Sequence, residues 1–270
     1  MLNRLREYLQ NLAPQGIALA YSGGADSTLL LAVLGEMRRK RPFPFAALTM
    51  RSVLQDSEEM AEAEELAEKF GVEQKVFGFN PFSLEEVRHN RTDRCYHCKK
   101  AIFTQFRDYA CANGLKYLLD GTNADDLNVY RPGRKALREL GVVSPLAELG
   151  ITKAEIRRMS AELGLPTASK PAAPCLATRF EYDTLLDDAA VRRVAEGERM
   201  IKETFPAIKD VRLRVHGNLA RIEAGKEYLP LVAAWAKEIS EKIKELGFDF
   251  VTLDLEGFRP GSFDVGLKQN

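Results

Sequence analysis

The segment from Ile17 to Val33 constrains the fold of this chain more than any other. A short apolar run, residues 17–21, leads into Ser-Gly-Gly, and Asp26, Ser27 and Thr28 then open a long apolar helical pattern. This order predicts a strand, a glycine turn and a helix N-terminus. Adjacent glycines allow backbone angles that other residues avoid, so N–H groups can approach a ligand closely. Because the positive end of a helix favours anions, the segment predicts a pyrophosphate site.

This loop differs from the common phosphate-binding loop, because no Gly-Lys-Ser or Gly-Lys-Thr follows the glycines. For the bare Ser-Gly-Gly, a tight strand-to-helix turn with an N-cap remains an alternative. The complete Ser-Gly-Gly-Ala-Asp-Ser, residues 22–27, is much more specific.

Strand and helix signals alternate through the first half of the chain. This alternation predicts an α/β fold, a doubly wound parallel sheet with helices on both faces. Ligands of such sheets bind beyond the carboxyl ends of the strands, which places residues 22–27, 50–52 and 121–126 on one rim. A Thr152/Glu155 capping box opens one of the helices. Strands are expected at 17–21, 45–50, 73–79 and 116–119, helices at 26–40, 56–70, 98–113 and 152–163, and an irregular stretch at 80–94.

The composition changes after Leu165, where three prolines punctuate a stretch rich in Ala, Ser and Thr. We expect a first domain of residues 1–168, a cysteine-bearing linker of residues 169–186 and a small α+β domain of residues 187–270. In the last domain we expect helices at 187–205 and 229–246 and a strand at 248–255.

A hairpin is predicted around Gly217-Asn218, a two-residue turn signal. Its register places Arg212 opposite Glu223 and Arg214 opposite Arg221 on one face. Like charges directly opposite each other are unfavourable unless something anionic lies between them. The face is therefore either a solvated charged surface or an arginine platform for a phosphate or carboxylate.

The four cysteines lie at positions 95, 98, 111 and 175. Cys95 and Cys98 form one Cys-x-x-Cys, which could be half of a zinc site, a redox pair or two ligands of an iron–sulfur cluster. Cys175 lies in a Pro-flanked loop near Lys170 and Arg179. Cationic neighbours of this kind lower the pKa of a thiol, so a nucleophilic thiolate is a further alternative. Cys111 fits an apolar helical pattern and is expected in the core.

The charges balance, with 39 Lys and Arg against 39 Asp and Glu. This balance argues against a broad nucleic-acid surface, which usually has a basic excess. No apolar run is long enough to cross a membrane, and no signal peptide is evident. We therefore expect a cytoplasmic protein.

Four motifs in order carry a family resemblance: SGGADS at 22–27, RCYHCK at 94–99, GTNADD at 121–126 and PCLATR at 174–179. The first alone matches the PP-loop pyrophosphatase superfamily. Together with VRLR at 211–214 and ARIE at 220–223, they make the chain similar to the LarE family of sulfur transferases in nickel-pincer nucleotide biosynthesis.

The resemblance implies that ATP and Mg²⁺ adenylate a carboxylate of pyridinium-3,5-biscarboxylic acid mononucleotide. Sulfur then comes sacrificially from Cys175, or through a [4Fe–4S] cluster held by Cys95, Cys98 and Cys175. Because this chain has all three cysteines, we favour the cluster-dependent form. The partners implied are a sulfur donor (sulfide or a desulfurase) and further copies of the chain, as a dimer or a trimer of dimers.

The resemblance also assigns site residues. Ser22, Gly23, Gly24, Asp26 and Ser27 would hold pyrophosphate and Mg²⁺, with Met50 and Ser52 near the adenine; Asp26 and Cys175 would be catalytic. Thr178, Arg179, Arg212 and Arg214 would bind the substrate phosphate, with Glu198 and Glu223 as acidic partners. Asp125 and Asp126 would bind metal or substrate, or cap the turn that follows.

Three other functions remain open at this point. A PP-loop tRNA thiolase would need a tRNA-sized basic surface. An amide-forming ligase of the NAD-synthetase type would leave the cysteines without a role. A nucleotide-binding regulator would bind ATP without releasing pyrophosphate.

Overall fold

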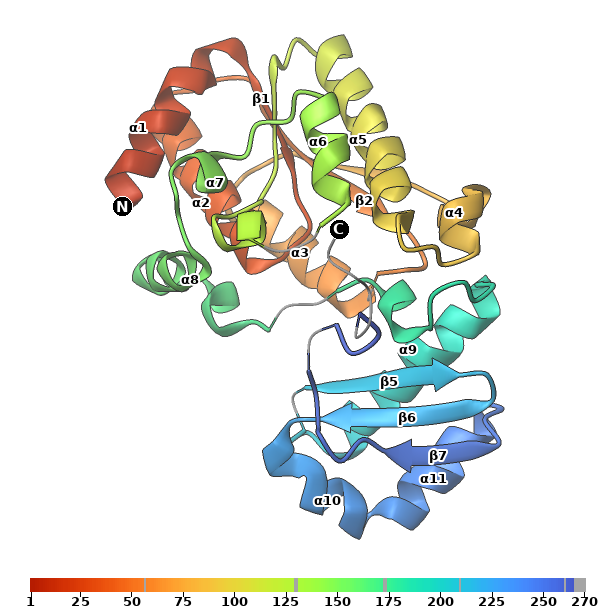
Figure 1. Ribbon diagram of the computed structural model, residues 1–270. Helices are drawn as coiled ribbons and strands as arrows, with labels where there is room; N and C mark the ends of the chain where they lie inside the picture. The colour runs from red at the N-terminus through yellow and green to blue at the C-terminus, as the bar shows by residue number, and fades with distance from the viewer. Residues whose placement is uncertain (56, 129–130, 172–173, 209, 260, 265–270) are drawn as a thin grey trace. The chain divides into compact units, whose positions relative to one another are not determined.

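The computed structural model describes residues 1–55, 57–128, 131–171, 174–208, 210–259 and 261–264. The chain forms two units (Figure 1): Met1–Pro81 with Asp93–Ala173, and Phe82–Thr92 with Pro174–Asn270. Residues 82–92 thus group with the second unit rather than with the sequence around them. The Asn90 side-chain amide donates to the carbonyls of Phe180 (3.1 Å) and Glu181 (2.7 Å), and these hydrogen bonds join residues 82–92 to the rest of the second unit.

A four-stranded parallel sheet forms the centre of the first unit, which confirms the predicted α/β fold. Ile17 lies opposite Phe45 on one side and Tyr117 on the other. In spatial order the strands are β3 (Gln74–Gly78), β2 (Phe45–Arg51), β1 (Ile17–Ala20) and β4 (Tyr117–Leu119).

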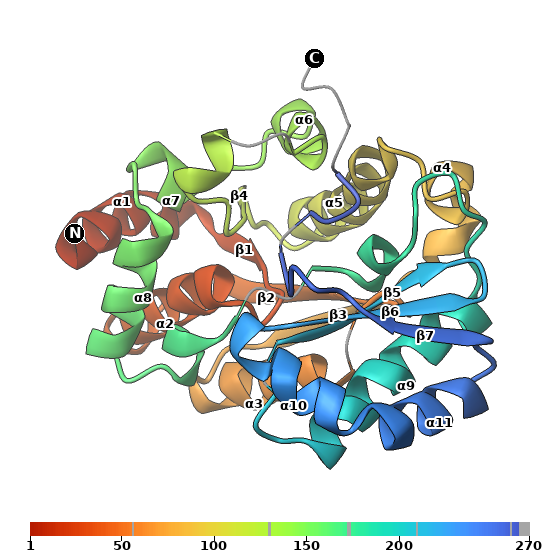
Figure 2. The ribbon, with the colours of Figure 1, turned by 60° about the horizontal axis from the view of Figure 1, so that its bottom comes forward.

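Helices cover both faces of this sheet (Figure 2). Side chains of a strand alternate between its two faces: Ile17 and Leu19 of β1 pack with Leu30, whereas Ala18 packs with Phe103. The first face is covered by α1 (Leu2–Leu12), α2 (Ala25–Lys40), α3 (Ser57–Lys69) and α8 (Lys153–Glu162), and the second by α5 (Arg94–Ala112) and α6 (Gly133–Glu139).

The capping box at the start of α8 is confirmed. The Thr152 side chain accepts from the Glu155 N–H, and the Glu155 carboxylate accepts from the Thr152 N–H. Two short helices of this unit, α6 and α7 (Pro145–Glu148), have no counterpart among the predicted elements, and α5 begins four residues earlier than predicted, at Arg94.

The second unit is a three-stranded sheet with helices α9 (Asp188–Thr204), α10 (Leu229–Ala234) and α11 (Ala236–Glu245). Its strands are β5 (Val211–His216), β6 (Leu219–Ala224) and β7 (Phe250–Leu253), and the short α4 (Glu85–Arg88) belongs to the same unit. The predicted hairpin register is confirmed. The single helix expected at 229–246 is wrong: Trp235, at φ −102° and ψ 19°, departs from helical angles and separates α10 from α11.

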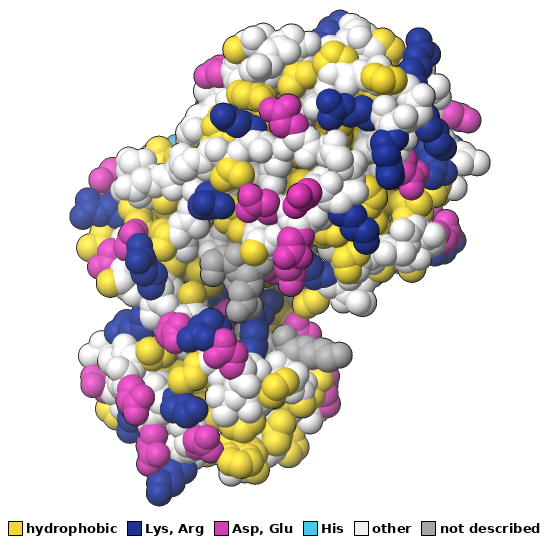
Figure 3. Space-filling model, turned by 180° about the vertical axis from the view of Figure 1, so that it is seen from behind, with side chains coloured by type: hydrophobic (Ala, Val, Ile, Leu, Met, Phe, Trp, Pro, Cys, Tyr) yellow, Lys and Arg dark blue, Asp and Glu magenta, His cyan; other side chains and the backbone are white. Residues whose placement is uncertain are grey.

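Acidic and basic side chains are intermingled on the face drawn in Figure 3, in keeping with the balanced charge of the sequence. Among the described residues, no helix has both the length and the apolar character needed to span a membrane.

Candidate functional site

The SGGADS loop joins β1 to α2 at the carboxyl end of the sheet, as predicted. Gly23 has a φ of +73°, and a Cβ at this position would lie 2.7 Å from the Cβ of Ala63 on α3, so the turn requires glycine. The hydroxyls of Ser22 and Ser27 lie 3.2 Å apart across the loop, and the Gly24 N–H points at the Ser22 hydroxyl at 3.4 Å. The loop therefore places hydroxyls and backbone N–H groups at the start of α2, where the helix dipole favours an anion.

Asp26, in the first turn of α2, is paired with a lysine that the sequence analysis did not select. Lys153 Nζ donates to both carboxylate oxygens of Asp26, at 2.6 and 2.7 Å. Burial raises the pKa of Asp26, and the Lys153 ammonium opposes that rise. One signal could have identified Lys153: it directly follows the Thr152 N-cap, in a helix that begins on the same rim.

The GTNADD segment after β4 lies against the loop. A Cβ on Gly121 would be 3.1 Å from the Ser27 nitrogen. Asp125 accepts the backbone N–H of Lys153 at 2.8 Å, so it helps to fix the helix start that carries this lysine. Asp126 accepts the Asn123 N–H at 3.1 Å and pairs with Arg131 at 2.9 Å. The residue that caps the turn is Asn123, whose side-chain oxygen accepts the N–H groups of Asp125 and Asp126 at 2.9 and 3.2 Å, so the predicted capping role falls to Asn123, and metal or substrate binding by the two aspartates stays a prediction.

The two residues predicted near the adenine lie at the end of β2. Met50 is buried in the apolar cluster that contains Phe103 and Phe106. The Ser52 N–H donates to the Gln55 side chain at 3.0 Å. Their contact with a nucleotide stays a prediction.

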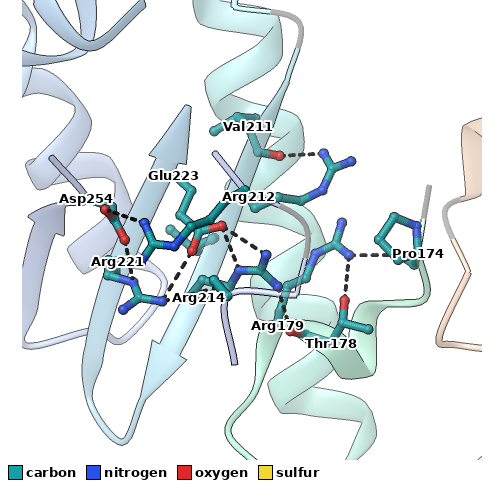
Figure 4. Close-up of polar contacts among 12 residues, drawn as sticks. Pro174, Thr178, Arg179, Val211, Arg212, Arg214, Arg221, Glu223 and Asp254 are labelled. Atoms are coloured by element: carbon teal, nitrogen blue, oxygen red, sulfur yellow. Dashed lines mark hydrogen bonds and ion pairs between the residues drawn. The ribbon is translucent and has the colours of Figure 1, made fainter. Parts of the chain in front are cut away.

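The charged face of the β5–β6 hairpin is buried, so the alternative of a solvated face is wrong. Arg212 and Arg214 are 5% and 4% exposed, and Glu223 is fully buried. Glu223 provides the anion that the opposed arginines require: its carboxylate pairs with Arg214 at 2.9 Å and with Arg221 at 3.2 Å (Figure 4).

Arg212 has a different environment. It donates to the Val211 carbonyl at 2.8 Å, and its guanidinium lies 5.1 Å from the centre of the Phe258 ring. Burial, reinforced by the nearby Arg179 guanidinium, lowers the pKa of Arg212. Burial likewise lowers the pKa of Arg214, against the opposing effect of Glu223. Burial therefore disfavours the charged form of both arginines, and an anion bound beside them would stabilise that form.

Cys175 is the N-cap of a 3₁₀ turn, Leu176–Arg179, that packs against β5 and α9. The Arg179 guanidinium donates to both carboxylate oxygens of Glu198, at 2.9 and 3.0 Å, and also to the Pro174 carbonyl and the Thr178 hydroxyl. Each nitrogen of Arg179 therefore donates to a protein acceptor, and its predicted role as a phosphate ligand stays untested.

Cys95 lies in the first turn of α5 and Cys98 follows at the start of the second, three residues apart and so on one helix face. Both are half-buried, as is Cys175, which belongs to the second unit. Two thiolates on one helix face suit a shared metal or cluster. Within the described parts of the chain, however, no three His, Cys, Asp or Glu side chains form a group that could hold a metal.

The prediction that Cys111 lies in the core is wrong, because this residue is exposed. The buried face of α5 is formed by Phe103, Phe106 and Ala110. Cys111 follows one residue later, which turns it about 100° away from that face.

Lys170, which lies near Cys175 in the sequence, pairs with Glu62 of the first unit at 2.8 Å.

Comparison with known proteins identifies the family. Residues 1–174 match the NAD synthase family. The pyridinium-3,5-bisthiocarboxylic acid mononucleotide synthase of Lactiplantibacillus plantarum is 34% identical over 256 residues, which cover 94% of this chain and 91% of that protein. The chain belongs to the LarE family. An uncharacterized protein of Synechocystis is 36% identical over 270 residues, 99% of this chain and 98% of that protein.

A more distant similarity is confined to part of the LarE-family chain. The argininosuccinate synthase of Haloarcula marismortui is 31% identical over 169 residues, which cover 57% of this chain and 39% of that enzyme. The similarity to the Lactiplantibacillus synthase, by contrast, extends through both units.

Proposed function

We propose that this protein is an ATP-dependent sulfur transferase that converts a carboxylate of pyridinium-3,5-biscarboxylic acid mononucleotide into a thiocarboxylate. The observation that carries the proposal is the similarity to a synthase of the bisthiocarboxylic product along nearly the whole chain. A match limited to residues 1–174 would support only the nucleotide-binding half of this activity.

In the proposed first step, ATP transfers AMP to the substrate carboxylate and pyrophosphate leaves. Ser22, Ser27 and the N–H groups at the start of α2 bind the pyrophosphate. Asp26 binds Mg²⁺ with its carboxylate, which requires Lys153 to release at least one carboxylate oxygen. Adenylation is chemically necessary, because a carboxylate oxygen is a poor leaving group whereas AMP is a good one.

In the proposed second step, sulfur replaces AMP. In the sacrificial form, the Cys175 thiolate attacks the acyl-adenylate and AMP departs. Loss of the Cα proton and cleavage of the Cβ–S bond then leave a thiocarboxylate on the substrate and dehydroalanine in the protein. The substrate phosphate would bind at the arginine face of the hairpin, beside Arg212, whose positive charge is buried.

The cluster-dependent form belongs to the same proposal. Cys95, Cys98 and Cys175 would be the thiolate ligands of a [4Fe–4S] cluster, and the α5 pair supplies two of them on one face. When bound, the cluster would supply hydrosulfide sulfur, so that Cys175 would be a ligand and survive turnover. The proposal also includes a sulfide or desulfurase donor, a cytoplasmic location and a homo-oligomer, a dimer or a trimer of dimers.

Anaerobic purification followed by turnover tests both forms. With ATP, Mg²⁺ and the nucleotide substrate, we expect pyrophosphate release and a thiocarboxylate product detected by mass spectrometry. Iron at about four per chain and an unchanged protein mass would support the cluster-dependent form. Loss of the mass of hydrogen sulfide from Cys175 would support the sacrificial form. Pyrophosphate release without any sulfur-containing product would contradict the proposal.

An amide-forming ligase is the second candidate, because the NAD synthase family match covers residues 1–174. In that case Cys175→Ala should keep full turnover with ammonia as the acceptor. The sulfur-transferase proposal expects this variant to release pyrophosphate and form no thiocarboxylate, with the exposed Cys111→Ala as the matched control.

A further inference from the structure

The backbone of the Cys175 turn is bound by two buried arginines. Arg179 donates to the Pro174 carbonyl at 2.8 Å, and Arg214 donates to the Thr178 carbonyl at 2.7 Å. The two acceptors lie on either side of Cys175 along the chain, and Figure 4 shows both arginines directed at the turn. Within the turn, the Thr178 N–H and hydroxyl both donate to the Cys175 carbonyl, at 3.0 and 2.9 Å.

Each of these arginines is in turn fixed by a buried carboxylate. Glu198 pairs with Arg179, and Glu223 pairs with Arg214; all four side chains are at most 6% exposed. Glu198 also accepts the backbone N–H of Leu213 at 2.9 Å, so one carboxylate joins the turn to strand β5.

Helix α9 holds Glu198 close to β5. A Cβ on the preceding residue, Gly197, would lie 2.7 Å from the Leu213 side chain, so the helix and strand approach as closely as glycine permits. After the turn, Phe180 forms a bridge with Val215 of the same strand. The cysteine is thus tied to the sheet through both the Arg179–Glu198 pair and the chain that follows it.

We infer that Arg179 and Glu198 are positioning residues that hold the Cys175 turn against β5, and not ligands of the substrate phosphate. This inference rests on the proposed sulfur transfer at Cys175. Glu198 already neutralises Arg179, and its carboxylate would repel a phosphate brought to the same guanidinium. Because the planar fork of Arg179 contacts Glu198 and the turn at once, a lysine, with a single nitrogen, cannot reproduce these contacts.

Two variants and a matched control test the inference in the full-length protein. Arg179→Lys keeps the positive charge but loses the planar guanidinium. Glu198→Gln removes the negative charge that holds the Arg179 guanidinium in place. Asp254→Asn is the control: it also removes a buried carboxylate of the second unit, but one whose ion pairs are to Arg221 and Arg259. Thermal melting first establishes that each variant is folded, and iron content is measured for all.

The first measurement is the rate at which iodoacetamide alkylates Cys175, followed by peptide mass spectrometry with Cys111 as the internal reference. The inference expects both test variants to alkylate Cys175 faster than the wild type, by roughly tenfold, because the turn is no longer held. Asp254→Asn should stay close to the wild type. A Cys175 rate in both test variants equal to that of the control would overturn the inference.

The second measurement separates binding from sulfur transfer. A displaced thiolate should slow sulfur transfer about 100-fold, while pyrophosphate release and the KM for the nucleotide substrate stay within about twofold. A raised KM with an unchanged maximal rate would instead assign Arg179 to the substrate phosphate and overturn the inference. If the wild type transfers no sulfur, the proposed function fails, and the alkylation rates still decide whether the pair holds the turn.

Discussion

Lys153 and Asp26, 127 positions apart in the chain, meet at 2.6 and 2.7 Å in the loop that begins α2. The lysine opens α8, where Thr152 caps the helix and Asp125 accepts the Lys153 N–H. The ammonium therefore occupies both oxygens of the carboxylate that is proposed to bind Mg²⁺. An incoming divalent cation must compete with the Lys153 ammonium for the Asp26 carboxylate. Before ATP binds, the ammonium therefore neutralises the charge of that carboxylate.

Replacing Lys153 with methionine should move the acid limb of the pH–activity profile to higher pH. Burial raises the pKa of Asp26 and Lys153 opposes this rise, so removal of the ammonium raises the pKa further. Because the protonated carboxyl binds Mg²⁺ poorly, pyrophosphate release should be lost at a higher pH than in the wild type. The exposed Lys69→Met serves as the control. An unchanged acid limb in Lys153→Met would contradict the proposed pairing.

Asp26→Asn should change the pH dependence of stability in a defined direction. The folded protein holds a proton on Asp26 more tightly than the unfolded chain, so the unfolding free energy contributed by this residue falls as pH rises. The contribution is complete below the ordinary pKa of 3.8 and is lost as pH rises through the folded-state value. Urea titrations of both proteins at several pH values should therefore show the wild type losing stability relative to Asp26→Asn with rising pH. A difference that grows in favour of the wild type would reverse the sign and refute the prediction.

Thr152→Ala should destabilise the first unit by about 1 kcal/mol, because α8 loses its N-cap hydroxyl. Thr152→Ser keeps the oxygen and should retain most of the stability. Chemical denaturation of both variants measures the difference. The alanine variant should also release pyrophosphate more slowly, since the same helix start positions Lys153; normal kinetics would show that Lys153 is held independently of the cap.

The capping box and the hairpin register were predicted because each depends on residues that are neighbours along the chain. The parallel sheet was predicted from the alternation of strand and helix signals, since alternating units favour this arrangement. For the opposed Arg214 and Arg221, the register left two interpretations, a solvated face or a platform for a phosphate or carboxylate. The structure places the carboxylate of Glu223, from the same hairpin, between them.

Contacts between segments that are distant in the sequence could not be predicted from local patterns. Nothing near Asn90 indicates that its amide would bind the carbonyls of Phe180 and Glu181. The position of Lys153 directly after the Thr152 N-cap is a signal for that residue, but it does not identify Asp26 as the partner. The predicted burial of Cys111 was wrong, because the position of a residue around the helix axis decides its burial. Cys111 lies one residue beyond the buried face of α5. Nor does the hairpin pattern indicate that Arg221 would also pair with Asp254, which lies beyond β7.

Arg212→Met should separate anion binding from folding on the arginine face. A lowered pKa means that the surroundings disfavour the positive charge, so its removal should leave the melting temperature unchanged or raised in phosphate-free buffer. Inorganic phosphate should stabilise the wild type, by about 2.7 kcal/mol at 100 times its dissociation constant, and should have little effect on the variant. Arg193→Met is the matched control, because Arg193 also lies over an aromatic ring, that of Phe248 at 4.3 Å. A variant that melts lower than the wild type yet keeps the phosphate response would show that Arg212 supports the fold and that the anion binds elsewhere.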